Sequence, residues 1–230
     1  MCGRFTLTSP AEVIASAFGI EPPGGFEARY NVCPSQAVLA VLRRGDEARR
    51  SFAFLHWGLV PHWMKDPPKD ARMINARSET AAEKPAFRDS FRTKRCLVPA
   101  DGFFEWKKEG RDKQPYLIRM KGGGPFAIAG LWASWRKGDG PRLESCSLLT
   151  TSPNELMEPI HDRMPVILPA EVWDLWLDTH VTEVDRLKPL LVSAAADSME
   201  AYPVSTHVNS PRNDDPRCLE RQAPLTLFDL

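Results

Sequence analysis

The fold class of this chain is decided by the stretch RCLVPADGFFEWKKEGRDKQPYLIRMKGGGPFAIAGLWASW (residues 95–135). Short runs of β-branched and aromatic residues fill this stretch, and Gly122–Gly124 forms a turn between two of them, a pattern typical of strands. Similar runs lie outside it, at residues 37–43, 50–58, 145–151 and 164–169. Many short strands at close spacing predict a curved, barrel-like antiparallel sheet.

Helical patterns are fewer than strand patterns. Residues 9–19 carry Ser9 as a predicted N-cap and Gly19 as a predicted C-terminal glycine, with apolar positions at helical spacing between them. Two further helical stretches are predicted at 82–92 and 169–178. A few helices beside many strands predict an α+β fold.

Composition narrows the class of protein. The chain has 230 residues with 30 basic and 30 acidic side chains, so its net charge is zero, which argues against a protein that coats polyanions by bulk charge. Residues 1–170 carry a net charge of +6 and residues 171–230 a net charge of −6. We therefore expect an anionic partner to bind to residues 1–170. The five cysteines form no C-x-x-C pair, and no apolar run reaches membrane-spanning length. We expect a cytoplasmic protein without a metal or a cofactor.

The N-terminal sequence MCGRF places Cys2 directly behind the initiating methionine. If Met1 is removed, Cys2 carries a free α-amine and a free thiol on adjacent carbons. Such a residue can hydrolyse an amide through its thiol, or condense with an aldehyde through its amine and then its thiol. The alternative, with about equal weight on position alone, is a small strand residue that packs inward.

Two further side chains are candidates for acid–base chemistry. Glu105 lies in the strand GFFEWKK, where an inward orientation among aromatic rings would raise its pKa and make it a general acid. An outward orientation would make it a surface carboxylate paired with a lysine. His161, in the polar segment HDR, is either a catalyst or a satisfied structural histidine.

The segment 61–80 is a long predicted loop, and long loops in compact domains are usually functional. Its INARSE motif offers Asn75 as donor and acceptor and Arg77 as a planar fork for a phosphate. Upstream, Trp63 and Met64 supply flat and apolar groups that can stack on bases or wedge between them. The alternative for this basic stretch is a solvated face.

Several motifs together resemble the SOS response-associated peptidase (SRAP) family of abasic-site processing proteins. They are MCGRF, RYNVCPSQ, HWGLVPHW, INARSET, CLVPADGFFEWKK and IHDRMPVIL. The resemblance runs in order from residue 2 to about 207, so we expect one SRAP catalytic and DNA-binding domain there. Residues 208–230, rich in proline, asparagine and aspartate, are predicted to form a flexible tail.

The resemblance implies a protein that recognises abasic sites in single-stranded DNA and links to them covalently as a thiazolidine through Cys2. By match to the family motifs, the expected catalytic residues are Cys2 as nucleophile, Asn75 as its positioning amide, and Glu105 and His161 as acid and base. The expected contacts to the DNA backbone are Arg4, Arg77, Thr150 and Arg163. Trp63 and Met64 are expected to wedge beside the lesion, Met64 standing where relatives can carry a second aromatic residue.

Two other functions stay open at this stage, namely an N-terminal-cysteine peptidase or amidase with His161 as base, and a non-covalent single-strand binding module. We expect a monomer at the nucleoid or replication fork. The terminal segment PLTLF (224–228) is similar to peptides that dock on the replication sliding clamp, with Pro224 in place of the usual glutamine. An unstructured apolar terminus is the alternative.

Overall fold

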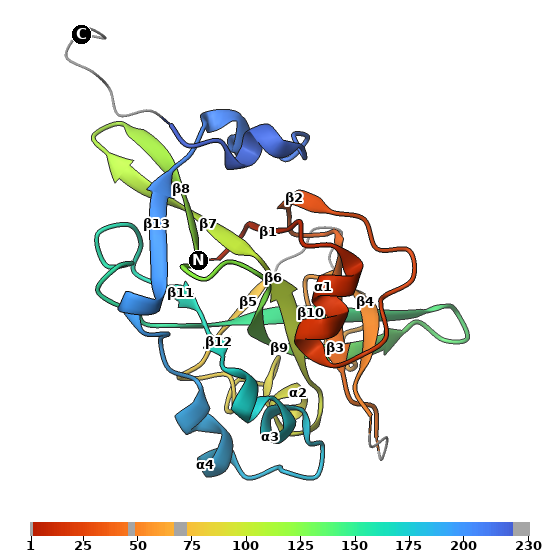
Figure 1. Ribbon diagram of the computed structural model, residues 1–230. Coiled ribbons are helices and arrows are strands. Elements are labelled where there is room, and N and C mark those ends of the chain that lie inside the picture. The colour runs from red at the N-terminus through yellow and green to blue at the C-terminus, as the bar shows by residue number, and fades with distance from the viewer. Residues whose placement is uncertain (1, 46–48, 67–72, 223–230) are drawn as a thin grey trace, which may run out of the picture.

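The computed structural model describes residues 2–45, 49–66 and 73–222 (Figure 1). Its strands form two sheets, and a few short helices lie outside them. The strands are β1 Phe5–Leu7, β2 Arg29–Val32, β3 Ala37–Leu42, β4 Ser51–Trp57, β5 Asn75–Arg77, β6 Arg95–Ala100, β7 Gly102–Glu109, β8 Asp112–Met120, β9 Phe126–Arg136, β10 Arg142–Thr151, β11 Met164–Pro165, β12 Ile167–Leu168 and β13 Met199–Pro203. The α-helices are α1 Ala11–Phe18, α2 Arg88–Thr93, α3 Trp173–Leu177 and α4 Val184–Leu187.

The larger sheet closes on itself. Strands β10, β4, β3, β6 and β9 pair in that order, and β9 pairs again with β10, so five strands form a closed ring. Large apolar side chains fill it, including Trp57, Leu42 and Leu97, none of which is exposed to solvent. The predicted α+β class with a barrel-like sheet is confirmed, because a closed ring is the limiting case of a curved sheet.

One edge of β10 departs from the antiparallel prediction. β10 pairs in parallel with β4 at Ser145 and Cys146, and then in parallel with β5 at Leu148, Leu149 and Thr150. Strand β5 lies inside the segment 61–80 that the sequence predicts to be one long loop. Its three residues are too few to show a strand pattern in the sequence.

The second sheet is antiparallel and has the order β13-β8-β7-β1-β2. The first strand of the chain is therefore an interior strand, with β2 on one side and β7 on the other. Phe5 lies opposite Val32 on β2 and opposite Phe103 on β7. This pairing holds the N-terminal end of the chain against the middle of the sheet (Figure 1).

The predicted helix at 9–19 forms as α1, and Gly19 ends it in the left-handed conformation with φ 64°. Ser9 does not cap the helix. Its hydroxyl donates to Asp101 instead, and Pro10 occupies the cap position. Phe18 at the end of α1 stacks on Trp173 of α3 with ring centroids 4.5 Å apart, which joins the first helix to the last third of the chain. None of the described helices combines the length and apolar character that a bilayer span requires.

Residues 208–222, the described part of the segment predicted to be a flexible tail, have a defined structure. Residues 206–209 and 216–219 form 3-10 turns, and Val208 and Cys218 are fully buried. Val204 pairs with Arg221, so the chain is held to the smaller sheet as far as Gln222. The PLTLF segment lies outside the described residues.

A buried arginine ties the helices to the barrel. Arg95 opens β6, is 2% exposed, and donates to five main-chain carbonyls at the ends of α2 and α3. The acceptors belong to Phe91, Arg92, Trp176, Asp178 and Val181. Burial lowers the pKa of this guanidinium to about 10, so it stays charged at neutral pH.

We expect Arg95→Leu to lower the free energy of unfolding by about 3 kcal/mol or more, because five main-chain carbonyls lose their donor, three of them in fully buried hydrogen bonds. For a chain of this size, that loss corresponds to a melting temperature lower by roughly 6–12 °C. Thermal unfolding followed by circular dichroism measures the shift, with the exposed Arg92→Leu as control. Equal melting temperatures for the two variants would show that Arg95 does not hold the helices in place.

Candidate functional site

Cys2 lies just before β1 and has no exposed surface. Its carbonyl accepts a hydrogen bond of 2.8 Å from Nδ2 of Asn75. Burial and the nearby Glu105 raise the pKa of its thiol well above the ordinary value. Cys2 does pack inward as a small residue, but it packs beside an amide and a carboxyl group rather than among apolar side chains only.

Glu105 points into the protein. It lies on β7, its side chain is 4% exposed, and burial raises its pKa to about 7. Its Oε2 is 3.7 Å from Nε2 of His161. The outward alternative, a surface carboxylate paired with a lysine, is therefore wrong. A carboxyl group with this pKa is partly protonated at neutral pH and can act as an acid or a base.

His161 follows a run of turns after Asn154 and reaches the same place from the other sheet. Its Nδ1 accepts a hydrogen bond of 3.0 Å from the main-chain N–H of Arg163. Nδ1 also lies 2.9 Å from the carboxylate of Asp162, and Nε2 faces Glu105. Burial lowers the pKa of His161, which favours the neutral ring. Glu105 and His161 thus face each other across 3.7 Å, where each can exchange a proton with a bound ligand.

The parallel pairing of β5 with β10 brings two more of the predicted residues together. Arg77 lies opposite Thr150, and Asn75 lies two residues before Arg77 on the same face of the sheet. Oδ1 of Asn75 and Oγ1 of Thr150 are both buried and have no hydrogen-bond partner within the described residues. Buried polar atoms are rarely left unsatisfied, so these two atoms, one of them on the side chain that contacts Cys2, indicate a site for a polar ligand.

The predicted arginines differ in how they are held. Arg77 is exposed, whereas both terminal nitrogens of Arg163 bind the carboxylate of Glu79 at 2.6 and 2.8 Å. Nη2 of Arg163 also donates to the carbonyl of Thr150. A phosphate that binds Arg163 must therefore share it with Glu79 or displace that carboxylate.

Arg4, Glu105 and His161 line one open pocket of about 520 Å³. The sequence does not single out its three other lining residues, Trp106, Lys113 and Asn209. Trp106 is adjacent to Glu105 in the strand GFFEWKK, a signal that could have been used. Asn209 lies in the segment predicted to be flexible, and only the fold brings it to the site.

Trp63 and Met64 belong to a different part of the surface. Trp63 is 52% exposed and lines a smaller pocket of about 300 Å³ with His62 and Lys94. Met64 is half-buried. No hydrogen bond or ring contact among the described residues joins this pair to the Cys2 cluster, so it can contribute only through an extended ligand.

The residues described contain no group of three His, Cys, Asp or Glu side chains that could hold a metal ion.

A larger open groove of about 1150 Å³ lies between α1 and β4, and none of the predicted site residues lines it. The chemistry available at the site is therefore that of Cys2, Glu105 and His161, with amide and guanidinium groups around them.

Comparison with known proteins gives consistent matches over nearly the whole chain. The family model described as SOS response associated peptidase (SRAP) matches residues 1–211. The abasic site processing protein YoqW of Bacillus subtilis (strain 168) is 47% identical over 224 residues, which cover 96% of this chain and 99% of YoqW. The abasic site processing protein HMCES of Xenopus tropicalis is 31% identical, over 95% of this chain and 78% of HMCES.

A solved structure of a protein from Bacteroides thetaiotaomicron superposes with a TM-score of 0.85. It is 29% identical in sequence, and the match covers 96% of this chain and 100% of that one. The two-sheet architecture is therefore shared with an experimentally determined structure.

We expect Glu105→Gln to stabilise the fold at pH 8 and not at pH 4. The folded-state pKa of about 7 lies above the value of a free glutamate, so stability falls as the pH rises from about 4.5 to 7. Above pH 7, the full cost of a buried charge applies, on the order of 3 kcal/mol, and glutamine avoids it. Urea unfolding at both pH values measures the difference. Equal gains at pH 4 and pH 8 would mean that ionisation of Glu105 is not the cause.

Proposed function

Because this chain belongs to the SOS response-associated peptidase family, we propose that it captures abasic sites in single-stranded DNA through a covalent bond to Cys2. The relatives named above as abasic site processing proteins support the choice of lesion. The observation that carries the proposal is the placement of Cys2 beside Asn75 and close to Glu105, whose carboxylate faces His161 at 3.7 Å in an open pocket. Removal of Met1 gives Cys2 the free α-amine that the reaction needs.

The first step is ring opening. An abasic deoxyribose is mostly a closed hemiacetal, and its aldehyde appears when the ring C–O bond breaks. Protonated Glu105 can donate a proton to the ring oxygen, and a neutral imidazole can accept the proton of the anomeric hydroxyl. The raised pKa of Glu105 and the lowered pKa of His161 favour these two starting forms at neutral pH.

The second step joins protein and DNA. The neutral α-amine of Cys2 adds to the aldehyde, and one water leaves to give an imine. The thiol then adds across the C=N bond, its sulfur to carbon and its proton to nitrogen, which closes a thiazolidine ring. The adjacent thiol reacts at an effective molarity that can reach about 10⁵ M, so the imine is captured before it eliminates and cuts the strand.

Asn75 has two uses in this scheme. Its Nδ2 fixes the carbonyl of Cys2, and its unsatisfied Oδ1 is available to accept a hydrogen bond from the α-amine. A hydrogen bond to that oxygen orients the amine without adding a charge, and so does not raise the amine pKa as a carboxylate would.

The phosphates on either side of the lesion are assigned to Arg4, Arg77, Thr150 and Arg163. The unsatisfied hydroxyl of Thr150 and the exposed guanidinium of Arg77 support this assignment. Exposed Trp63 and half-buried Met64 are assigned to stack beside the flanking base. A few local contacts of this kind are compatible with a chain that has no net charge.

Peptidase chemistry has less support. A thiol peptidase attacks with its thiolate, and burial beside Glu105 disfavours the thiolate of Cys2. The aldehyde reaction begins with the amine and needs the thiol only after the imine has formed. The site therefore favours condensation with an aldehyde over attack on a peptide carbonyl.

We expect the purified protein to lack Met1 and to form an adduct with a single-stranded oligonucleotide that bears one abasic site. The adduct mass should equal protein plus oligonucleotide minus one water, as measured by intact mass spectrometry. Cys2→Ala should form no stable adduct but should retain an imine that borohydride traps, because it keeps the α-amine. Retention of Met1, or a stable adduct in Cys2→Ala, would contradict the aminothiol mechanism.

We expect the rate of adduct formation to follow a bell-shaped pH profile. The rate should rise from acid pH as the α-amine loses its proton and fall above about pH 7 as Glu105 ionises. Glu105→Gln should lower the rate by about 10²–10³-fold and remove the fall at high pH. Single-turnover gel assays from pH 5 to 9 measure both effects. A profile that is flat from acid to neutral pH would show that loss of the α-amine proton does not control the rate.

Docking on a sliding clamp through residues 224–228 stays a prediction, as do the monomeric state and the cytoplasmic, fork-associated location. Deletion of residues 222–230 should abolish clamp binding in a pull-down with purified clamp. The deletion should leave adduct formation unchanged, because none of the site residues named above lies in it. Failure of the intact protein to bind the clamp would end this hypothesis.

A further inference from the structure

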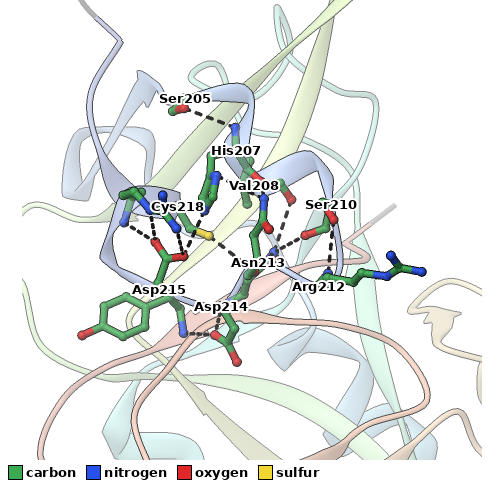
Figure 2. A network of polar contacts seen from close by, with 12 residues as sticks. Ser205, His207, Val208, Ser210, Arg212, Asn213, Asp214, Asp215 and Cys218 are labelled. Carbon is green, nitrogen blue, oxygen red and sulfur yellow. Dashed lines mark hydrogen bonds and ion pairs between the residues drawn. The ribbon is translucent and has the colours of Figure 1, made fainter.

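Residues 205–219, here called the strap, form a dense polar network against the smaller sheet (Figure 2). Within the strap, His207 bonds to Asp215 at 3.0 Å, and Asn213 donates to the carbonyl of His207 at 2.7 Å. These contacts give a segment without helices or long strands a defined shape. The strap follows β13 and returns to the chain start, where it meets β2 and Arg4.

Asp214 fastens the strap to β2. Its Oδ1 accepts hydrogen bonds from the main-chain N–H groups of Tyr30 and Asn31 at 2.6 and 2.9 Å, and its Oδ2 pairs with Arg29. One carboxylate thus binds three successive residues of the strand. Two of these contacts are to the backbone, so they fix where the strand lies relative to the strap.

Asn31 connects the strap to Arg4. This side chain is completely buried, and its Nδ2 lies within hydrogen-bond distance of the carbonyls of Val208, Ser210 and Asn213. Its Oδ1 accepts from Nη1 of Arg4 at 2.8 Å. The same Nη1 donates to the carbonyl of Val208 at 2.8 Å. Both hydrogens of Nη1 are therefore used.

The rest of the Arg4 guanidinium is left for a ligand. Nε is buried and has no hydrogen-bond partner in the described chain. Nε and Nη2 form the edge of a guanidinium that binds phosphate with two parallel hydrogen bonds. The group lies over the ring of Trp106, 5.5 Å from its centroid, and lines the pocket that holds Glu105 and His161.

The acceptors that hold Arg4 are neutral. An amide oxygen and a carbonyl fix the guanidinium without cancelling its charge. Arg163, in contrast, is held by the carboxylate of Glu79. The strap also sets the ring of Trp106, because Asn209 accepts a hydrogen bond of 2.7 Å from its Nε1.

We propose that the strap is a positioning element for DNA binding, in which Asp214 and Asn31 hold Arg4 with its Nε–Nη2 edge turned to a phosphodiester next to the lesion. This inference rests on the proposed function for the identity of the ligand. Asp214 and Asn31 are positioning residues, because they act through Arg4 and do not touch the DNA. The family match ends at residue 211, so Asp214 lies beyond it.

The test measures binding of an intact single-stranded oligonucleotide by fluorescence anisotropy at several salt concentrations. Asp214→Ala should weaken binding by about tenfold, and Arg4→Ala should do the same, as expected for the loss of one charge-assisted contact. Each variant should also reduce the slope of log affinity against log salt by about 0.7, the value for one phosphate on a single strand. The double variant Arg4→Ala/Asp214→Ala should be no worse than Arg4→Ala.

The matched control is Glu144→Ala, which removes another half-buried carboxylate paired with an arginine, Arg44, on strands outside the strap. It should leave the affinity and the salt slope unchanged. Asp214→Asn should restore most of the binding, because an amide oxygen still accepts from the backbone of β2. If Asp214→Ala does not fold, Asn213→Ala loosens the strap at His207 without touching β2 and should show the same direction and the same dependence on Arg4.

The outcomes separate this inference from the proposed function. Equal losses in Asp214→Ala and Glu144→Ala, or a loss that persists in the Arg4→Ala background, would overturn the positioning role. Wild-type protein that binds single strands with the expected salt slope but forms no adduct would overturn the covalent function and leave the strap intact. Absence of salt-dependent binding by the wild type would overturn both.

Discussion

The structure depends on β10, which pairs with two different strands along one of its edges. A strand has two edges for hydrogen bonding, and β10 uses one of them to pair with β9 along seven residue pairs. The other edge pairs first with β4, which closes the barrel, and then with β5, which carries Asn75 and Arg77. The hydrogen bonds that close the barrel and those that position Asn75 and Arg77 therefore follow one another along the same edge of β10. A shift in the register of β10 would disturb both.

The chemistry of the site depends on which charged groups are buried and which partners they have. Glu105, buried between β8 and β1 on the smaller sheet, holds a proton near neutral pH because it is removed from water. Arg4 and Arg163 are both fixed, but only Arg163 has its charge met by a carboxylate. The protein thus keeps one carboxyl group partly neutral and one guanidinium held by neutral acceptors at the same pocket. The buried carboxyl group lowers fold stability above neutral pH.

The sequence predicts most strands correctly because their apolar runs are long and are punctuated by turns, as in residues 126–135. It also predicts the C-terminal end of α1, where Gly19 has the expected left-handed conformation, but not the N-cap, which is Pro10 instead of Ser9. It does not predict β5, because three residues carry no periodicity. It also does not predict that β5 pairs in parallel with β10, because the paired residues Asn75 and Leu148 are 73 positions apart in the chain. The sequence does not predict the ordered strap either, for a different reason. Polar composition suggests disorder, but here Asp214 and Asn31 use their polar atoms to bind main chain.

The strap gives the chain an order of assembly. Arg4 donates a hydrogen bond to the carbonyl of Val208, 204 residues further along the chain. During synthesis, the N-terminal residues leave the ribosome first, and the carbonyl of Val208 that holds Arg4 emerges 204 residues later, followed by Asp214. The guanidinium of Arg4 is therefore set in place only after residues 208–214 have been synthesised. A truncated product of the ribosome would carry the N-terminal cysteine without the contacts that orient its binding pocket.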